Sequence, residues 1–352
     1  MVGREVLARL ARDPGFERVL CLIRPSERES AQARLDAVLA KVDEAPQPGR
    51  LVAITGDVVQ GELGLSSSDR ATLREADRII HCAASVSFDL PLDESRLINV
   101  IGTERMIALA RTMPRLARFD AVSTAYVAGK RDDLVHEAEL EHARGFHNSY
   151  EQSKYESEQL LRRIMHELPI AVHRPSIVVG DSRTGRTGAW KVLYWPLKVI
   201  ARGFLPVIPY DADCRLDVVP VDFVADAILA LGRDPTTLGR TFHLTAGPQR
   251  DATMADFTRV VFAKLGRRPP LRVKPSSFRS VVRPVLMRLP SKTLRRTLNT
   301  GLAYRPYLEL RLRFDTREAD AALAGLGVRC PSVLEYMDTI IDAALRSDFG
   351  RR

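Results

Sequence analysis

Short apolar, β-branched runs alternate with longer amphipathic stretches over the first 245 residues of this chain. The runs are typical of buried strands, and the stretches carry apolar residues at three- and four-residue intervals, as one face of a helix does. Strands and helices in regular alternation fold into a parallel sheet covered by helices. The expected strands are 19–23, 51–54, 79–82, 119–123 and 170–173, and the expected helices are 28–42, 94–111 and 150–166.

The alternation loosens after about residue 246, where prolines interrupt short helical pieces. We therefore expect an α/β, doubly wound parallel sheet with a smaller, mainly helical C-terminal substrate lobe. The predicted core comprises residues 1–180 and 215–245, and the predicted lobe comprises residues 181–214 and 246–352.

The composition excludes several classes of protein. With 45% hydrophobic and 28% charged residues, the 352-residue chain is an ordinary globular sequence. It has no apolar run near the roughly 18 residues that cross a bilayer and no secretory signal, so we expect a cytoplasmic protein. The four cysteines are far apart and form no Cys-x-x-Cys pair, so neither a disulfide framework nor a metal site is expected.

The positive charge is concentrated in residues 264–313. This stretch holds 14 Lys or Arg and one acid, Glu309, for a net 14 − 1 = +13, whereas the rest of the chain sums to 9 − 13 = −4. Apolar residues alternate with the cations, which suits a surface for phosphates, an acidic protein or peripheral contact with a membrane. A solvated helix face is the alternative. Nucleic-acid binding is not expected, because aromatics are few and no recognised module is present.

The pattern Tyr-x-x-x-Lys occurs three times, so only its context can select a functional pair. Tyr126 follows a predicted strand, and the match at Tyr194 contains Pro196, which disfavours a helix interior. Only the match at Tyr150 continues as a long amphipathic helix, where the two side chains lie one turn apart on the same face. The three pairs are Tyr126 with Lys130, Tyr150 with Lys154 and Tyr194 with Lys198.

Several segments together resemble one known family. They are Met1-Val2-Gly3, Cys21-Leu22-Ile23-Arg24, Gly56-Asp57-Val58, His81-Cys82-Ala83-Ala84 and the Tyr150 to Lys154 segment. Over almost the whole chain, these resemble the extended short-chain dehydrogenases, in the branch of thioester reductase domains and male sterility-type fatty acyl-CoA reductases. The resemblance implies a Rossmann-type sheet and a nicotinamide dinucleotide cofactor.

The chain opens differently from that family. Gly3 resembles the last glycine of the family's Gly-rich turn, and the strand and earlier glycines that precede it in the family are absent from this sequence. That strand is central in the family's sheet, so we expect a gap between its two neighbours and an apolar slot. We expect that the start codon is assigned too far downstream, and a shortened, cofactor-free relative is the alternative.

The resemblance also implies which residues meet the cofactor. Arg24 matches the position at the end of the second strand where a basic residue meets a 2′-phosphate, which favours NADP(H) over NAD(H). Asp57 matches the residue that accepts from the adenine amino group, and Asn99 matches one that stabilises the catalytic region. The implied cofactor-binding residues are Gly3, Arg24, Asp57, Ala83, Ala84, Lys154, Pro175 and Ser176.

Thr124, Tyr150 and Lys154 are the implied catalytic residues. A free phenol has a pKa of about 10, and an ammonium one turn away is expected to bring the pKa of Tyr150 closer to neutrality. Tyr150 would donate a proton to the carbonyl oxygen, Lys154 would hold the ribose, and Thr124 would hydrogen-bond the oxyanion. Ser123 is the competing hydroxyl, whereas His243 is expected to be a core histidine.

The segments 147–156, 181–185 and 313–315 resemble the acyl-thioester-reducing branch. They imply an NADPH-dependent reductase of a fatty acyl-CoA or an acyl-carrier protein, with an aldehyde or alcohol product. A nucleotide-sugar epimerase or dehydratase, a hydroxysteroid-type dehydrogenase and a catalytically silent dinucleotide-binding regulator are the alternatives. The acyl chain and the oligomeric state are not indicated by the sequence.

Overall fold

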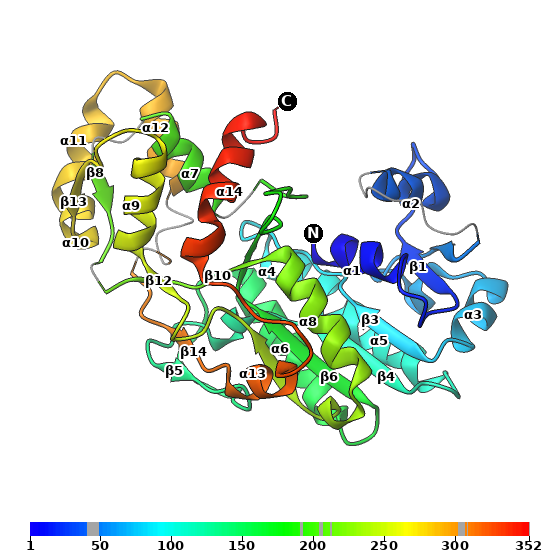
Figure 1. Cartoon of the computed structure of the whole chain (residues 1–352). Helices are drawn as coiled ribbons and strands as arrows, with labels where there is room; N and C mark the ends of the chain where they lie inside the picture. Colours follow the sequence, from blue (N-terminus) through cyan, green and yellow to red (C-terminus); the bar gives the residue numbers. More distant parts are fainter. Residues whose placement is uncertain are drawn as a thin grey trace.

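A four-stranded parallel sheet forms the centre of the molecule (Figure 1). The computed structural model describes residues 1–40, 49–190, 193–203, 207–211, 213–301, 307 and 309–351. The strands lie in the order β11, β6, β4, β3, and each neighbouring pair is parallel. Their bounds are β3 (Arg78–His81), β4 (Arg118–Val122), β6 (Ile170–Pro175) and β11 (Thr241–Leu244). The predicted parallel sheet is confirmed.

Helices cover both faces of this sheet. On one face, α5 (Gly102–Arg111) and α6 (Ser149–Ile164) contribute Met106 and Leu161 to a cluster with Phe119 of β4. On the other, α1 (Val2–Leu10) packs on α8 (Val221–Arg233), and their apolar residues join those of β11 in a second cluster. Apolar burial on both faces makes the sheet doubly wound, as the Rossmann-type prediction required.

The strands β1 (Val19–Ile23) and β2 (Leu51–Thr55) form a separate parallel ladder. Among the described residues, no strand connects β1 to β3. All five residues of β1 are partly exposed, whereas all six residues of β6 are buried. The expected gap, which lies between β1 and β3, is therefore present. Among the described strands, β1 is paired on one edge only, by β2.

The lobe surrounds its own apolar cluster, which α7, α9 and α14 share. Its helices are α7 (Tyr194–Ala201), α9 (Met254–Lys264), α10 (Pro275–Ser277), α11 (Arg283–Arg288), α12 (Lys292–Thr300) and α14 (Val333–Arg346). Two small ladders join them, β8 (Val207–Pro209) with β13 (Leu271–Val273) and β9 (Arg215–Leu216) with β12 (Ala252–Thr253).

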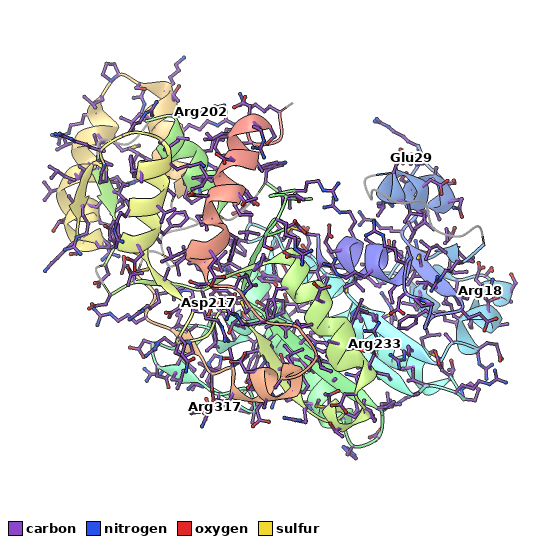
Figure 2. The ribbon with its side chains drawn as sticks, in the orientation of Figure 1. Arg18, Glu29, Arg202, Asp217, Arg233 and Arg317 are labelled. Atoms are coloured by element: carbon purple, nitrogen blue, oxygen red, sulfur yellow. The ribbon has the colours of Figure 1, made fainter. Side chains whose placement is uncertain are left out.

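Asp217 lies where the lobe meets the sheet (Figure 2). Its carboxylate accepts from the amides of Ala246 and Gly247 at 2.9 and 3.1 Å, just beyond β11. Burial raises the pKa of this carboxyl above its usual value. Nearby, β10 (Val218–Pro220) pairs with β7 (Ile177–Val179).

The C-terminal part of the chain returns to the core between α12 and α14. The strand β14 (Arg313–Phe314) pairs with β5 (Leu134–Val135), and α13 (Arg317–Leu323) packs against β11 and α8. These elements fall within the predicted lobe range but contact the core. The division into two units stays a prediction.

Two predicted helices differ in detail from the observed ones, and one observed helix was not predicted. The helix expected at 28–42 is α2 (Ala31–Leu39), and residues 41–42 lie outside the described ranges. The helix expected at 94–111 is made of α4 (Leu92–Arg96), a wider π-type turn over 97–101, and α5. A further short helix, α3 (Ser67–Arg74), precedes β3. Within the described ranges, no helix is long and apolar enough to cross a membrane.

The expectation that Pro196 would keep Tyr194 and Lys198 out of a continuous helix is wrong. Both residues lie in α7, because Pro196 occupies the first turn, where its missing amide breaks no helical hydrogen bond. The Tyr194 hydroxyl accepts from the Gly180 amide at 2.9 Å, and its ring is 2% exposed in the core of the lobe. Tyr194 is therefore a packing residue.

Candidate active site

The first turn of α6 carries the selected Tyr-Lys pair. Asn148 caps this helix, and its side chain accepts from the Glu151 amide at 2.9 Å, so the helix begins immediately before Tyr150. Tyr150 and Lys154 then lie one turn apart on the same face of the helix. Lys154 is only 4% exposed.

Thr124 lies beside Tyr150 at the end of β4. Its side chain accepts from the Tyr126 amide at 3.3 Å and donates to the Pro175 carbonyl at 3.4 Å. The Thr124 side chain lowers the pKa of the phenol, although burial has the larger, opposite effect. The structure therefore brings together two of the predicted catalytic hydroxyls.

The competing hydroxyl, that of Ser123, is engaged elsewhere. It donates to Glu158 Oε2 at 2.7 Å, in a fully buried position behind α6. Because successive residues of a strand point to opposite faces, only one of the two hydroxyls can face Tyr150. The geometry supports Thr124 and places Ser123 in the framework.

The expected effect of Lys154 on Tyr150 is not what the structure shows. Burial raises the pKa of Tyr150 to about 12, the nearby Thr124 side chain opposes this, and the charge of Glu151 adds to it. Burial likewise lowers the pKa of Lys154 to about 8, and its ammonium donates to the Val122 carbonyl at 2.9 Å. The prediction of a phenol pKa closer to neutrality is wrong for the chain as described, because desolvation outweighs the neighbouring charge.

A buried polar network positions α6 against the loop that follows β3. Asn99, 2% exposed and within the π-type turn, donates to Ser153 Oγ at 2.9 Å and accepts from the Ser85 amide at 2.8 Å. One turn further, the hydroxyls of Thr103 and Ser157 lie 2.8 Å apart. Wider helical turns often occur at functional sites. Asn99 therefore connects the loop after β3 to the helix that carries Tyr150.

An ion pair stabilises the other side of α6. Glu158 and Arg174 are both 0% exposed, and their side chains form a bidentate contact with distances of 2.6 to 3.0 Å. Burial is the largest single effect and would raise the pKa of Glu158, but the charge and hydrogen bonds of Arg174, together with Arg162 and Ser123, outweigh it and the pKa is lowered. His243, also buried, lies 3.2 Å from Arg174, in the core position expected of it.

The start of α1 fits the pyrophosphate of a dinucleotide. The amides of Arg4 and Glu5 both donate to Met1 O, so within the described residues the helical ladder leaves the amides of Val2 and Gly3 for a ligand or water. A Cβ at Gly3 would lie 3.2 Å from Cys82 Cβ, which shows how closely this turn approaches the end of β3. Backbone amides at a helix start are a common site for phosphate.

The remaining residues predicted to bind the cofactor lie after successive strands. Arg24 follows β1 with an exposed side chain, and Asp57 follows β2 and accepts from the Val59 amide at 3.0 Å. Ala83 and Ala84 follow β3, one exposed and one half-buried. The carboxyl ends of parallel strands meet at one edge of a sheet, where open α/β folds bind ligands.

Pro175 and Ser176 are both buried at the end of β6. The Pro175 carbonyl is the acceptor for Thr124, and the Ser176 amide donates to the Leu244 carbonyl at 3.4 Å. Both residues therefore lie next to the catalytic hydroxyls. Their contact with a nicotinamide ring stays a prediction.

Two residues next to the site were not predicted from the sequence. The ring of Tyr307 lies 5.7 Å from that of Phe88, which in turn lies 6.0 Å from Tyr150. No sequence motif pointed to Tyr307, because this residue lies far along the chain from α6. Phe88 follows shortly after the His81-Cys82-Ala83-Ala84 segment that resembles the family, but no role was assigned to it.

Glu151 is a third residue that was missed. It is 0% exposed, accepts from the His147 amide at 2.8 Å, and burial raises its pKa to about 7. Its place between Tyr150 and Lys154 could have drawn attention to it. A buried carboxyl directly beside the catalytic phenol affects the charge of the site.

Comparison with known proteins identifies the family and the fold. Residues 1–228 match the family model described as male sterility protein, an NAD-binding family. A nonribosomal peptide synthetase, asaC of Aspergillus flavus, is 30% identical over 75% of this chain and 27% of its own length. The fatty acyl-CoA reductase wat of Drosophila melanogaster is 29% identical over 66% of the chain and 52% of its own length. Human fatty acyl-CoA reductase 2 is 27% identical, over 79% and 64% respectively.

The chain thus spans less than two thirds of these curated relatives. Among solved structures, the terminal R domain of the myxalamid PKS-NRPS pathway has a TM-score of 0.84 at 28% identity, covering 99% of this chain and 89% of that one. The reductase domain of a nonribosomal peptide synthetase from Mycobacterium tuberculosis has a TM-score of 0.73 at 24% identity, with the same coverage, and shows the likeness of fold.

Proposed function

Because this chain belongs to the male sterility protein family and is an NAD(P)-dependent oxidoreductase, we propose that it uses NADPH to reduce an acyl thioester. The acyl group is proposed to be carried by coenzyme A or by a carrier protein, and the product to be an aldehyde or an alcohol. The named relatives include fatty acyl-CoA reductases and a reductase domain of a peptide synthetase.

One observation carries the proposal. The hydroxyl of Thr124, the phenol of Tyr150 and the ammonium of Lys154 are gathered at the carboxyl ends of β4 and β6, and the Thr124 side chain is close enough to Tyr150 to influence its pKa. Two hydroxyls on one side of a carbonyl oxygen can stabilise the charge that develops there. This arrangement suits reduction of a carbonyl group.

The raised pKa of Tyr150 agrees with reduction of a carbonyl group, in which the phenol donates a proton. With a pKa of about 12 the phenol stays protonated at neutral pH, so it can donate to the carbonyl oxygen of the substrate. Thr124 donates the second hydrogen bond, and Lys154 holds the nearby ribose. When bound, NADPH supplies the hydride. Departure of the thiol from the resulting hemithioacetal leaves the aldehyde.

Arg24 supports NADPH over NADH. Its exposed guanidinium follows β1, and it forms no ion pair within the described ranges. A free arginine at this place suits the 2′-phosphate, whereas NADH-binding sites carry an acid. The carboxylate of Glu5, near the proposed phosphate site, is paired with Arg4 and Arg9 at 3.3 Å each, which reduces its repulsion of phosphate.

The proposal is tested by measuring NADPH oxidation by the purified protein with long-chain and short-chain acyl-CoA and with an acyl-carrier protein. We expect turnover with at least one thioester and loss of about 100-fold or more of kcat in Tyr150→Phe, with NADPH affinity retained. The product is identified by mass spectrometry.

Three outcomes would contradict the proposal. Turnover of nucleotide sugars without thioester turnover would favour an epimerase or dehydratase, and turnover of sterols alone would favour a hydroxysteroid-type dehydrogenase. Binding of NADPH in a titration, without oxidation by any of these substrates, would favour a catalytically silent regulator.

A further inference from the structure

The tip of the lobe exposes apolar side chains. We define the lobe-tip surface as residues 275–300, which comprise α10, the π-type turn over 278–282, α11 and α12 (Figure 1). Val281, Val285 and Leu289 follow one another at four-residue intervals, the spacing of one helix face, and are 61%, 55% and 45% exposed. On most protein surfaces large aliphatic side chains are exposed singly, whereas these three are exposed in a row.

These exposed side chains are not needed to fill the apolar interior of the lobe tip. The inward positions of the same helices are already filled, since Leu286 and Leu298 are 8% and 6% exposed. The helices α11 and α12 also pack on each other. The outward stripe is therefore left without a partner in the part of the chain that the structure describes.

The lobe-tip surface is also strongly basic. Between residues 275 and 300 there are six Lys or Arg and no Asp or Glu. Arg279 pairs with Glu309, and Arg283 donates to Asn299. The exposed cations Arg288, Lys292 and Arg296 have no acidic partner among the described residues.

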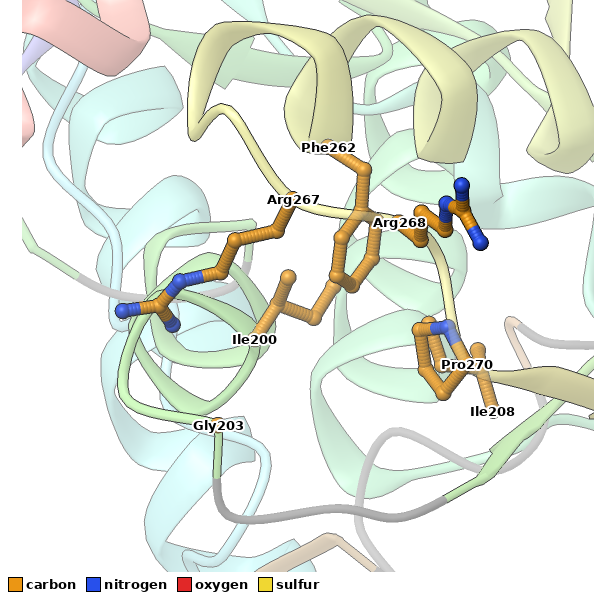
Figure 3. A pocket seen from close by; sticks show the side chains of 7 residues that line it. All are labelled: Ile200, Gly203, Ile208, Phe262, Arg267, Arg268 and Pro270. Carbon is orange, nitrogen blue, oxygen red and sulfur yellow. The ribbon is translucent and has the colours of Figure 1, made fainter.

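A shallow pocket in the same lobe has a similar character (Figure 3). Ile200, Phe262 and Pro270 form an apolar floor, with Arg267 and Arg268 on either side of it. Leu271, which follows Pro270 in the chain, is 78% exposed and begins β13, which leads into α10. Apolar side chains bordered by cations thus extend beyond the lobe-tip surface itself.

We propose that the lobe-tip surface binds peripherally to an anionic lipid membrane. Amphipathic helices that lie on membranes place aliphatic side chains among the acyl chains and cations among the phosphates. An acidic protein fits less well. Arginine is present, but protein interfaces also concentrate binding in Trp and Tyr, and the only aromatic residue between 275 and 300 is the half-buried Phe278. This inference does not depend on the proposed reaction.

Flotation with lipid vesicles tests the inference without any catalytic readout. We expect the protein to float with vesicles of equal parts phosphatidylcholine and phosphatidylglycerol, not with phosphatidylcholine alone, and to dissociate at high salt. Arg288→Gln, Lys292→Gln and Arg296→Gln together should weaken binding about 100-fold. Val281→Asn, Val285→Asn and Leu289→Asn together should weaken binding at low salt, although all the cations of the surface are retained.

A matched control removes the same charge elsewhere. Arg18→Gln, Arg115→Gln and Arg163→Gln replace three exposed arginines of the core. Equal loss of binding in this control and in the lobe-tip charge variant would overturn the inference, since it would show attraction by net charge alone. Circular dichroism confirms that each variant is folded.

An acidic carrier protein is the competing partner. If wild type does not bind the anionic vesicles, and the lobe-tip charge variant instead raises KM only for a carrier-bound thioester, the surface serves a protein and the membrane proposal is wrong. Turnover of a short, water-soluble acyl-CoA should be the same in all these variants. Vesicle binding by a protein that turns over no thioester would leave the membrane inference standing and contradict the proposed reaction.

Discussion

The hydroxyl of Tyr307 donates a 3.0 Å hydrogen bond to Glu151, the residue that follows the catalytic tyrosine. Asn148 donates to the same hydroxyl at 3.0 Å, so the cap of α6 and its first turn are both connected to Tyr307. Tyr307 is 8% exposed and Glu151 is 0% exposed. A residue from the C-terminal part of the chain thus stabilises the start of the catalytic helix.

Replacing Tyr307 by Phe should reduce the free energy of unfolding by about 1–3 kcal/mol. The variant keeps the ring contact with Phe88 but leaves Glu151 and Asn148 each without one partner. Denaturant unfolding measures the loss. Tyr307→Ala, which also removes the ring, should lose more. Equal stability of Tyr307→Phe and wild type would show that the hydroxyl contributes nothing.

Glu151 should make the stability depend on pH. Burial raises the pKa of its carboxyl from 4.5 to about 7, so between these values the folded state binds more protons than the unfolded state. The contribution of Glu151 to stability is therefore present below pH ~4.5 and is lost as the pH rises to about 7.

Glu151→Gln should remove that part of the dependence. The amide oxygen can still accept from His147 or Tyr307, and the variant should exceed wild type in unfolding free energy by on the order of 3 kcal/mol at pH 8, with a smaller difference at pH 5. Urea unfolding at the two pH values measures this. A constant difference at both would contradict the raised pKa.

Thr124 and Ser123 should respond differently to loss of their hydroxyls. Thr124→Val removes a donor to the developing oxyanion, and we expect kcat to fall about 100-fold or more with little change in stability. Ser123→Ala removes a donor to the buried Glu158, so it should reduce stability while kcat changes little. Steady-state kinetics and thermal unfolding of both variants measure this. A loss of kcat in Ser123→Ala together with a loss of stability in Thr124→Val would instead assign the catalytic role to Ser123.

Arg24 should decide between the two nicotinamide cofactors. Arg24→Glu places an acid where the 2′-phosphate is expected, so the Kd for NADPH should rise at least about tenfold and that for NADH should not. Fluorescence titration of each cofactor measures both constants. Arg18→Gln, another exposed arginine of the core, is the control. An equal rise in the Kd values for NADPH and NADH would mean that Arg24 does not recognise the 2′-phosphate.

Local pattern determined much of this protein. The strands expected at 19–23, 119–123 and 170–173 and the helix expected at 150–166 lie within a few residues of β1, β4, β6 and α6, because apolar periodicity reports which face of an element is buried. The pairing of Tyr150 with Lys154 followed from helical spacing, and the gap beside β1 followed from the resemblance.

Only the tertiary structure decided the properties that depend on distant neighbours. The contact of the Ser123 hydroxyl with Glu158, which supports the choice of Thr124 that the resemblance implied, is one such property. The pKa of Tyr150 is another, because it rises when packing removes water from the phenol. The contact between Tyr307 and Glu151 joins residues that no local pattern connects. Burial and long-range contacts arise from how elements pack, whereas periodicity depends on neighbours in the chain.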